Sequence, residues 1–382
     1  MPDVPGPLSP EQFRALFPSL AHTIHVASCS FAPPSTHLID AQAALMTQLE
    51  SGAAPWHFYE AHLDEVRQRF GSIIGSTADH IAVMPNASVG AFQAGSTIDW
   101  EERTRIVASV TDFPSLAHVW HRLATDVRLI EAAPDGGIQV DQYLAAIDAV
   151  TGLVSIPLVS YRNGARAGLA DIVAVAERAR AVGARVIIDA YQAAGVVPCD
   201  VAELPCDFLV GGAMKFLLGL PGVAYLYVRE PADGRAPTLT GWFGRQNPFA
   251  FDPRGVDFPA EARRFETGTP QFPLLCAAVP GLDLIAGLDS EQVWHHVSGL
   301  VEHATTELDE ATELAVLTPP LPERRGPMVA LGARDAAHAN AVADDLAGQA
   351  IVASPRGDVV RLTFHYFNTA DDVLAITKAL RV

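Results

Sequence analysis

Two charged residues stand at the ends of apolar segments, where a charge is costly. Asp189 follows the β-branched run Val186-Ile187-Ile188, and Lys215 follows the run Phe208-Leu209-Val210 and four small or apolar residues. A buried carboxylate needs a positive partner, a helix N-terminus or a loop salt bridge. The lysine is either a surface residue with a buried stem or a desolvated amine whose lowered pKa favours Schiff-base chemistry.

The two residues together indicate a site for pyridoxal 5′-phosphate (PLP). PLP chemistry needs a lysine for the aldehyde and a carboxylate that keeps the pyridine nitrogen protonated, so that the ring accepts electrons. Both groups should lie beyond the carboxyl ends of neighbouring parallel strands, where open α/β sheets bind ligands. A Walker phosphate loop is excluded, because Phe216 follows Lys215 where Ser or Thr is required. We therefore predict Lys215 and Asp189 as the catalytic residues.

The segment from 81 to 228 alternates short β-branched runs with Ala-rich helical stretches, which predicts an α/β fold. The runs are Arg105–Val110, Leu153–Val159, Arg185–Asp189 and Val223–Val228, and one such helix is Leu169–Val182. Short buried strands with crossover helices predict a mostly parallel central sheet with flanking helices. At the N-terminus, Ser9 and Gln12 predict a capped helix start.

The pattern changes after Gly241, where longer helices are followed by a mixture of strands and helices. Helices are expected over Phe272–Ala286 and Ser290–Leu314. A chain of 382 residues fits a large and a smaller domain. We predict an N-terminal segment (1–30) that packs on the small domain, a large cofactor-binding domain (31–255) and a small α+β C-terminal domain (256–382).

The amino-acid composition disfavours several classes of binding partner and cellular location. The net charge of −18 disfavours nucleic acid and anionic lipid, and no apolar run is long enough for a membrane span. The N-terminus lacks the pattern of a signal peptide. Four cysteines without CxxC spacing predict reduced thiols and a cytoplasmic location. His118 and His121 have no third ligand nearby in sequence, so no metal site is expected.

Further motifs follow one another along the chain. They are Asn86-Ala87-Ser88-Val89, Asp112-Phe113-Pro114-Ser115, Ser160-Tyr161-Arg162-Asn163-Gly164, Asp189-Ala190-Tyr191-Gln192, Ala213-Met214-Lys215, Gly241-Trp242-Phe243-Gly244, Gly268-Thr269-Pro270 and Val360-Arg361-Leu362. This ordered set resembles the class V aminotransferase-like family of fold-type I PLP enzymes, and within it most resembles kynureninase. The resemblance covers most of the chain.

The resemblance implies roles for these motifs, and it places the segment Ser160–Gly164 in a strand-end loop beside the cofactor. Ala87 and Ser88 would bind the phosphate, which suits the free N–H groups before a helix. Phe113 would stack on the pyridine ring, and Gln192 would lie beside the cofactor. The indole N–H of Trp242 would bind phosphate, and Thr269 would reach the phosphate of the neighbouring subunit. The chain is therefore expected to form a homodimer with shared active sites.

The substrate site is expected at two places. Arg361 lies within the apolar run Val359-Val360-Arg361-Leu362 and would hold the substrate α-carboxylate, since planar bidentate recognition suits a buried guanidinium. The alternative is an edge-strand arginine in water. Ser28 lies in a segment that the resemblance places by the substrate. The side-chain pocket is expected around Pro55-Trp56-His57-Phe58. Within the family that the chain resembles, a desulfurase would require a mobile cysteine near the C-terminal part of the site for a persulfide. No cysteine follows Cys276, which falls in an apolar helical run and is expected to pack, so no cysteine-bound persulfide is expected.

Departures from kynureninase leave the reaction open. Gln192 stands where kynureninases carry His, and Met214 stands where they carry a phosphate-binding Tyr. We expect an amino-acid substrate and cleavage at its β-carbon, either hydrolysis of a 3-acylalanine or β-elimination of a cysteine conjugate. The alternatives are a class V aminotransferase or epimerase, and a non-catalytic PLP-binding homologue.

Overall fold

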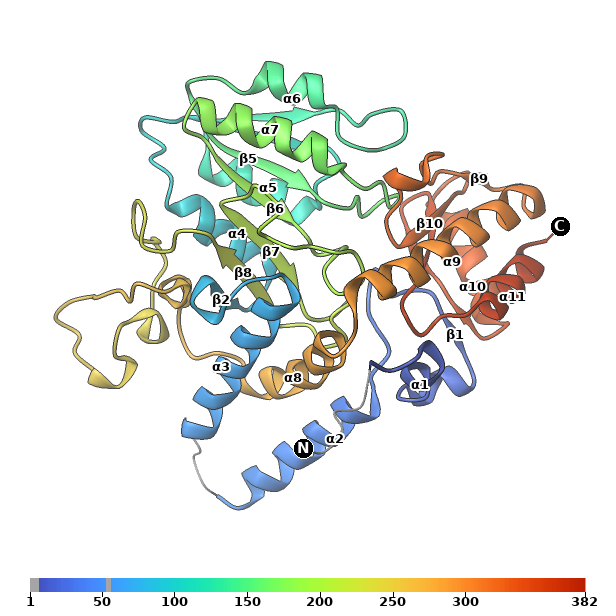
Figure 1. The fold of residues 1–382 in the computed structure, drawn as a ribbon, viewed down its shortest axis with the longest axis horizontal. Helices are drawn as coiled ribbons and strands as arrows, with labels where there is room; N and C mark the ends of the chain where they lie inside the picture. The colour runs from blue at the N-terminus through green and yellow to red at the C-terminus, as the bar shows by residue number, and fades with distance from the viewer. Residues whose placement is uncertain (1–6, 53–55, 382) are drawn as a thin grey trace.

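A seven-stranded sheet forms the centre of the protein (Figure 1). The computed structural model describes residues 7–52 and 56–381. The strands are β2 (Ile81–Met84), β3 (Arg105–Ser109), β4 (Asp126–Ile130), β5 (Thr151–Pro157), β6 (Arg185–Asp189), β7 (Phe208–Gly212) and β8 (Ala224–Val228). Their order is β2-β8-β7-β6-β5-β3-β4. The strands from β7 to β4 pair in parallel, as the sequence predicts.

Strand β8 is the exception, because it pairs antiparallel with both β7 and β2. The segment 213–223 that joins β7 to β8 contains no helix. Antiparallel neighbours can be joined by a short loop, whereas parallel neighbours need a crossover. The missing crossover helix therefore accounts for the direction of β8.

Helices cover both faces of this sheet. The helices around it are α3 (Trp56–Ile73), α4 (Ala87–Ser96), α5 (Pro114–Leu123), α6 (Val140–Ala146) and α7 (Leu169–Ala181). Neighbouring strand residues point to opposite layers. Ile106 packs in one cluster with Trp120 of α5, while Val107 packs in the other with Val175 of α7. This alternation is the geometric consequence of a pleated strand buried on two sides.

The C-terminal part has its own four-stranded antiparallel sheet, ordered β12-β13-β10-β9. Its strands are β9 (Ala315–Val316), β10 (Met328–Gly332), β12 (Ser354–Arg356) and β13 (Val359–Thr363). The helices are α9 (Ser290–Ala311), α10 (Ala336–Ala347) and α11 (Ala370–Leu380). Figure 1 shows this part, in orange and red, beside the large sheet.

The described N-terminal residues lie against the C-terminal part. Strand β1 (Ile24–His25) pairs in parallel with β11 (Ile351–Val352). In α1 (Pro10–Arg14), Ser9 and Gln12 form the predicted capping box, and Arg14 pairs with Asp372 at 2.9 Å. The division of the chain at residues 30 and 255 stays a prediction.

Helix α8 (Phe272–Ala286) leads from the large sheet into the C-terminal part, and it packs against α2 (Thr36–Glu50) and α3. In the described ranges, no single helix is long and apolar enough to cross a membrane. Only α8 and α9 taken jointly meet that measure, and they are bent by 88° from each other.

A buried ion pair ties α3 to the segment after η5 (Ala262–Phe265). Arg67 donates to the two carboxylate oxygens of Glu266 at 2.9 and 2.7 Å, and Glu266 also accepts the Val83 N–H at 3.0 Å. The two charged side chains are almost fully buried. Removing one member of such a pair leaves an uncompensated charge in a low-dielectric interior.

We expect Glu266→Gln to lower the free energy of unfolding by about 3 kcal/mol, measured by urea denaturation. The matched control is Asp283→Asn, because half-exposed Asp283 pairs with Arg69 near the surface and its loss should cost about 0–1 kcal/mol. Equal losses in the two variants would contradict the importance of the buried pair.

Candidate active site

A cavity of about 270 Å³ lies at the carboxyl ends of the parallel strands. Of the predicted site residues, the cavity is lined by Ala87, Ser88, Phe113, Asp189, Gln192, Lys215 and Arg361. Asp189 ends β6, Lys215 follows β7, and Arg361 comes from β13 of the C-terminal sheet. Residues distant in the sequence are thus brought together where the sheet topology predicts a ligand site.

The amine of Lys215 is enclosed between two aromatic rings. Its Nζ lies 4.3 Å from the centroid of the Tyr191 ring and 5.5 Å from that of the Phe113 ring. Burial lowers the pKa of Lys215 to about 8; the charges of Asp189 and Cys29 oppose this shift, and Arg361 and Arg356 add to it. A lysine with this pKa is a better nucleophile and base near neutral pH than an exposed one.

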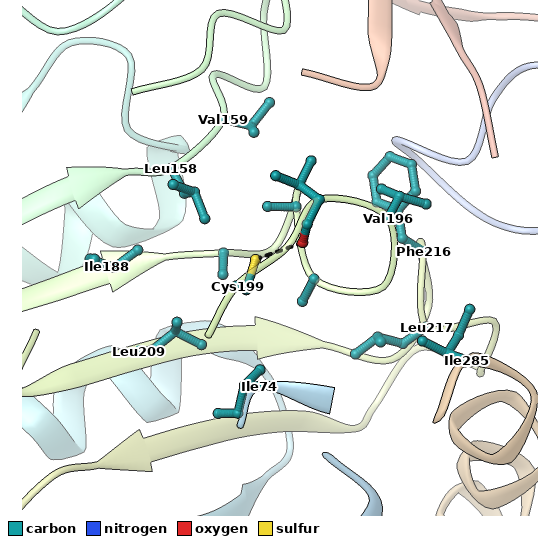
Figure 2. Close-up of a cluster of buried hydrophobic side chains, with 14 of the residues drawn as sticks. Ile74, Leu158, Val159, Ile188, Val196, Cys199, Leu209, Phe216, Leu217 and Ile285 are labelled. Carbon is teal, nitrogen blue, oxygen red and sulfur yellow. Dashed lines mark hydrogen bonds between the residues drawn. The ribbon is translucent and has the colours of Figure 1, made fainter. Parts of the chain in front are cut away.

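The backbone behind Lys215 is anchored in the core. Figure 2 shows Phe216 and Leu217 in a cluster of buried side chains that includes Ile188 of β6 and Leu209 of β7. The Gly219 N–H donates to the Ala213 carbonyl at 2.8 Å and closes the turn. The residues after the lysine therefore hold its backbone in place below the cavity.

Asp189 is buried at the end of β6. One carboxylate oxygen accepts the Tyr191 N–H at 2.9 Å. Burial raises the pKa of Asp189, while that hydrogen bond and the charge of Lys215 lower it. A glycine next to the lysine loop makes room for this arrangement, since a Cβ at Gly212 would lie 2.2 Å from the Tyr191 ring.

A second buried carboxylate, Asp112, lies three residues after β3, between Thr111 and Phe113, which both line the cavity. It accepts hydrogen bonds from Ser155 Oγ at 2.7 Å and Trp120 Nε1 at 3.4 Å. Burial and the charge of Asp189 raise the pKa of Asp112 to about 7. Asp112 belongs to the motif Asp112-Phe113-Pro114-Ser115, of which only Phe113 was predicted as a site residue. The signal that could have revealed Asp112 is a carboxylate three residues after an apolar strand.

The first residues of α4 offer donors to an anion. Asn86 caps the helix by accepting the Val89 N–H at 3.0 Å, and Ala87 and Ser88 occupy the first two helical positions. The N–H groups at these positions have no partner within the helix. Because they lie at a helix N-terminus and line the cavity, they suit a phosphate.

Arg361 is buried and its hydrogen-bond partners are all uncharged. The guanidinium donates to the Tyr161 carbonyl at 2.8 Å, to Ser30 Oγ at 3.0 Å, and to the hydroxyl and carbonyl of Ser354 at 2.7 and 3.2 Å. Burial lowers the pKa of Arg361. No carboxylate among the described residues pairs with it, which leaves its charge available to a ligand carboxylate.

Trp242 and Thr269 do not line the cavity. The indole N–H of Trp242 donates to Thr269 Oγ1 at 3.2 Å, and the Trp242 ring packs 5.5 Å from that of Trp56. Glycines beside Trp242 permit close approach of the chain itself: a Cβ at Gly241 would lie 2.4 Å from the Thr267 backbone. The phosphate roles of Trp242 and Thr269 stay predictions.

Two other predicted places also lie apart from the cavity lining. Ser28 is fully buried and its hydroxyl has no partner in the described chain, whereas the adjacent Cys29 and Ser30 do line the cavity. In the expected side-chain pocket, Pro55 lies outside the described residues, and the residues from Trp56 to Phe58 begin α3 without lining the cavity.

Several cavity residues were not among the predicted site residues. They are Cys29, Ser30, Tyr161, Tyr191 and Arg356. Tyr161 and Tyr191 nevertheless fall within motifs that carry the resemblance. All four cysteines are free and buried, and Cys276 packs in α8 as expected. Within residues 7–52 and 56–381, no group of three or more His, Cys, Asp and Glu side chains could hold a metal ion.

The residues present fit PLP. An enclosed amine for the aldehyde, a buried carboxylate for the pyridine nitrogen, an aromatic ring and a helix N-terminus share one cavity. Gln192 adds an orphaned polar atom: its Nε2 donates to the Cys29 carbonyl at 3.2 Å, while its Oε1 is buried without a partner. A buried acceptor without a donor indicates that a ligand completes the site.

Comparison with known proteins also identifies a PLP-dependent enzyme family. The family model for aminotransferase class-V matches residues 56–376, so the chain belongs to this family. The uncharacterized aminotransferase YcbU of Bacillus subtilis (strain 168) is 32% identical over 366 residues, which is 95% of both chains. The kynureninase of Deinococcus radiodurans is 32% identical over 229 residues, 59% of this chain and 54% of that one.

Among solved structures, a variant of the cystine C-S lyase C-DES, with glycine covalently linked to its PLP cofactor, superimposes with a TM-score of 0.87. The match covers 96% of this chain and 98% of that one at 19% identity. The fold is therefore the predicted fold type I of PLP enzymes. Membership of the class V aminotransferase family identifies PLP as the cofactor.

We expect Lys215 to capture PLP at a rate that rises with pH and levels off above about pH 8, because only the neutral amine attacks the aldehyde. The rate can be followed by absorbance when PLP is added to apo-protein, and borohydride should then fix the cofactor to the peptide that contains Lys215. In Asp189→Asn the midpoint should move to lower pH, since Asp189 raises the pKa of Lys215. A rate that still rises above pH 10 would contradict the desolvated amine.

We expect Arg361→Lys to raise KM and lower kcat about tenfold or more each while the cofactor spectrum stays normal. A point charge cannot replace the two-pronged hold on a carboxylate that orients the bond to be broken. With a decarboxylated amine as substrate, the wild-type enzyme should show the same loss of kcat/KM as the variant shows with the amino acid. Arg361→Lys should then cause little further loss of kcat/KM with the amine. Simple addition of the two losses would place the carboxylate site elsewhere.

Proposed function

We propose that this chain is a PLP-dependent enzyme that cleaves an amino-acid substrate at its β-carbon. The observation that carries the proposal is the position of the Lys215 amine, enclosed in the same cavity as Arg361. Bound PLP supplies an electron sink for charge that develops on the substrate α-carbon. The remaining tasks fall to the residues of this chain.

Each task has a matching side chain. Arg361 binds the substrate α-carboxylate and fixes the orientation of the α-carbon. Lys215 would remove the α-proton and return a proton, for which a pKa near the working pH is suited. Asp189 holds the pyridine nitrogen protonated. Phe113 and Tyr191 flank the amine and exclude water from it.

Cleavage at the β-carbon draws support from the related kynureninase, an enzyme that by its name acts on kynurenine. The two forms of the reaction are hydrolysis of a 3-acylalanine and β-elimination of a cysteine conjugate. Both begin with the same proton removal by Lys215, so one set of residues serves either. Cys276 is buried in α8 outside the cavity, which leaves a persulfide on this residue out of the proposal.

Transamination is the second candidate, because the Bacillus subtilis relative that is named an aminotransferase matches along 95% of both chains. Lys215 would then return the proton to the cofactor side rather than to the substrate.

We further propose a cytoplasmic homodimer with shared active sites. Trp56, Phe249 and Phe251 leave 39%, 37% and 71% of their surface exposed around Trp242. Such an aromatic patch is typical of an interface. A partner docked there would bring Trp242 and Thr269 to the phosphate end of the neighbouring cavity.

A product assay separates these reactions. Holoenzyme is offered a panel of amino acids that includes kynurenine and S-substituted cysteines, and alanine, pyruvate and keto acids are measured separately. We expect alanine from hydrolysis or pyruvate from β-elimination, with none in Lys215→Ala. A keto acid that retains the whole substrate side chain, formed together with an aminated cofactor, would establish transamination instead.

A further inference from the structure

We propose that Arg356 recognises an anionic group at the far end of the substrate side chain, so that the preferred substrates are amino acids with an acidic side-chain terminus. The inference rests on the proposed function, since it takes Arg361 as the site of the α-carboxylate. Arg356 lies on the rim of the same cavity, and no sequence motif pointed to it.

The hairpin of β12 and β13 places the two arginines on one face. In the antiparallel register, Arg361 lies opposite Ser354 and Val359 lies opposite Arg356. Side chains two residues apart on a strand point the same way, and directly opposed residues share a face. Arg356 is therefore the diagonal neighbour of Arg361, and both line the cavity.

Arg356 has an exposed guanidinium without a protein anion to neutralise it. In the part of the chain that the structure describes, it makes no side-chain hydrogen bond and no ion pair. The nearby carboxylate on the hairpin turn, Asp358, pairs instead with Arg162 at 2.8 Å. A left-handed turn residue, Gly357 with φ 56°, separates Arg356 from Asp358.

The charge of Arg356 reaches the reacting groups. The positive charge of Arg356 lowers the pKa of Lys215 and of Arg361, so it lies close enough to interact electrostatically with both groups. Among the described residues, three basic groups line the cavity, and the one carboxylate that lines it, Asp189, serves the cofactor. Because Arg361 takes the α-carboxylate, a second negative charge on the substrate is the natural complement of Arg356.

Two roles are open to Arg356: binding of an anion at the end of the substrate side chain, and binding of the α-carboxylate together with Arg361. The first is favoured. Arg361 is held at four points by Ser30, Tyr161 and Ser354 and is already preorganised. Arg356 has no such support and stands at the solvent side of the cavity, where the end of a substrate side chain would emerge. A mobile guanidinium at a rim can follow side chains of different length.

The experiment compares acids with their neutral amides. Dissociation constants are measured from the change in cofactor absorbance when holoenzyme is titrated with aspartate and asparagine, glutamate and glutamine, and S-carboxymethylcysteine and its amide. We expect at least one acid to bind about tenfold or more tightly than its amide, as for a charge-assisted hydrogen bond. Arg356→Gln should abolish that difference while leaving the amides unchanged, and Arg356→Lys should restore part of it.

The control is Arg180→Gln, which removes one positive charge from an exposed position on α7 and should leave every constant unchanged. If wild type binds acids and amides equally, or if Arg356→Gln weakens both to the same extent, Arg356 does not recognise the side chain and the inference is overturned. If no amino acid alters the cofactor absorbance in any variant, the proposed function itself fails.

Discussion

The burial of unneutralised positive charge at the edge of the large sheet is the constraint on which this site depends. Lys215 and Arg361 are both desolvated, and burial lowers the pKa of each. Charge in a low-dielectric interior is costly unless a partner meets it. Among the described residues, Arg361 donates only to neutral oxygens, and the Lys215 amine lies by the rings of Tyr191 and Phe113, with the charge of Asp189 near enough to raise its pKa. Under the proposed function, a substrate carboxylate supplies the anion that Arg361 lacks.

The rest of the fold supports this arrangement from both sides. The large sheet supplies the strand ends for Asp189 and Lys215, and the buried cluster in Figure 2 holds the segment after the lysine. The C-terminal sheet supplies Arg361 through a five-residue strand paired on both sides. Helix α8 packs on α2 and α3, whereas α9 packs on α11, β9 and β10 of the C-terminal part, so two consecutive helices, bent by 88° from each other, connect the two parts.

The sequence predicts best what depends on local periodicity. Asp189 and Lys215 follow apolar runs that are strands in the structure, and the alternation of runs and helices predicts the parallel part of the sheet. The direction of β8 depends on the absence of a crossover, which hydrophobic runs alone do not reveal. Tyr191, although part of the motif Asp189-Ala190-Tyr191-Gln192, and Arg356 were not predicted as cavity residues, because their positions follow from tertiary packing and hairpin register. Trp242 and Thr269 were predicted by resemblance alone, and a single chain leaves them beside each other instead of at the cavity.

The residues suited to the cofactor and those suited to the substrate come from different parts of the fold, which bears on substrate specificity. The groups that suit the cofactor, including Ser88, Asp189 and Lys215, come from the large sheet and its loops, whereas the groups suited to the substrate come from the N-terminal segment and the C-terminal hairpin. Ser30 links the N-terminal segment to the hairpin. Its hydroxyl forms a hydrogen bond with the Ser354 hydroxyl at 2.6 Å and accepts one from Arg361 at 3.0 Å. Under the proposed function, a substitution in the hairpin therefore changes which substrate is held and leaves the strand ends that position Lys215 and Asp189 in place, although loss of an arginine there also removes a charge that lowers the pKa of Lys215. The cofactor site stays the same while the substrate side chain varies, because Arg356 and Arg361, the residues proposed to bind the substrate, lie on a separate sheet.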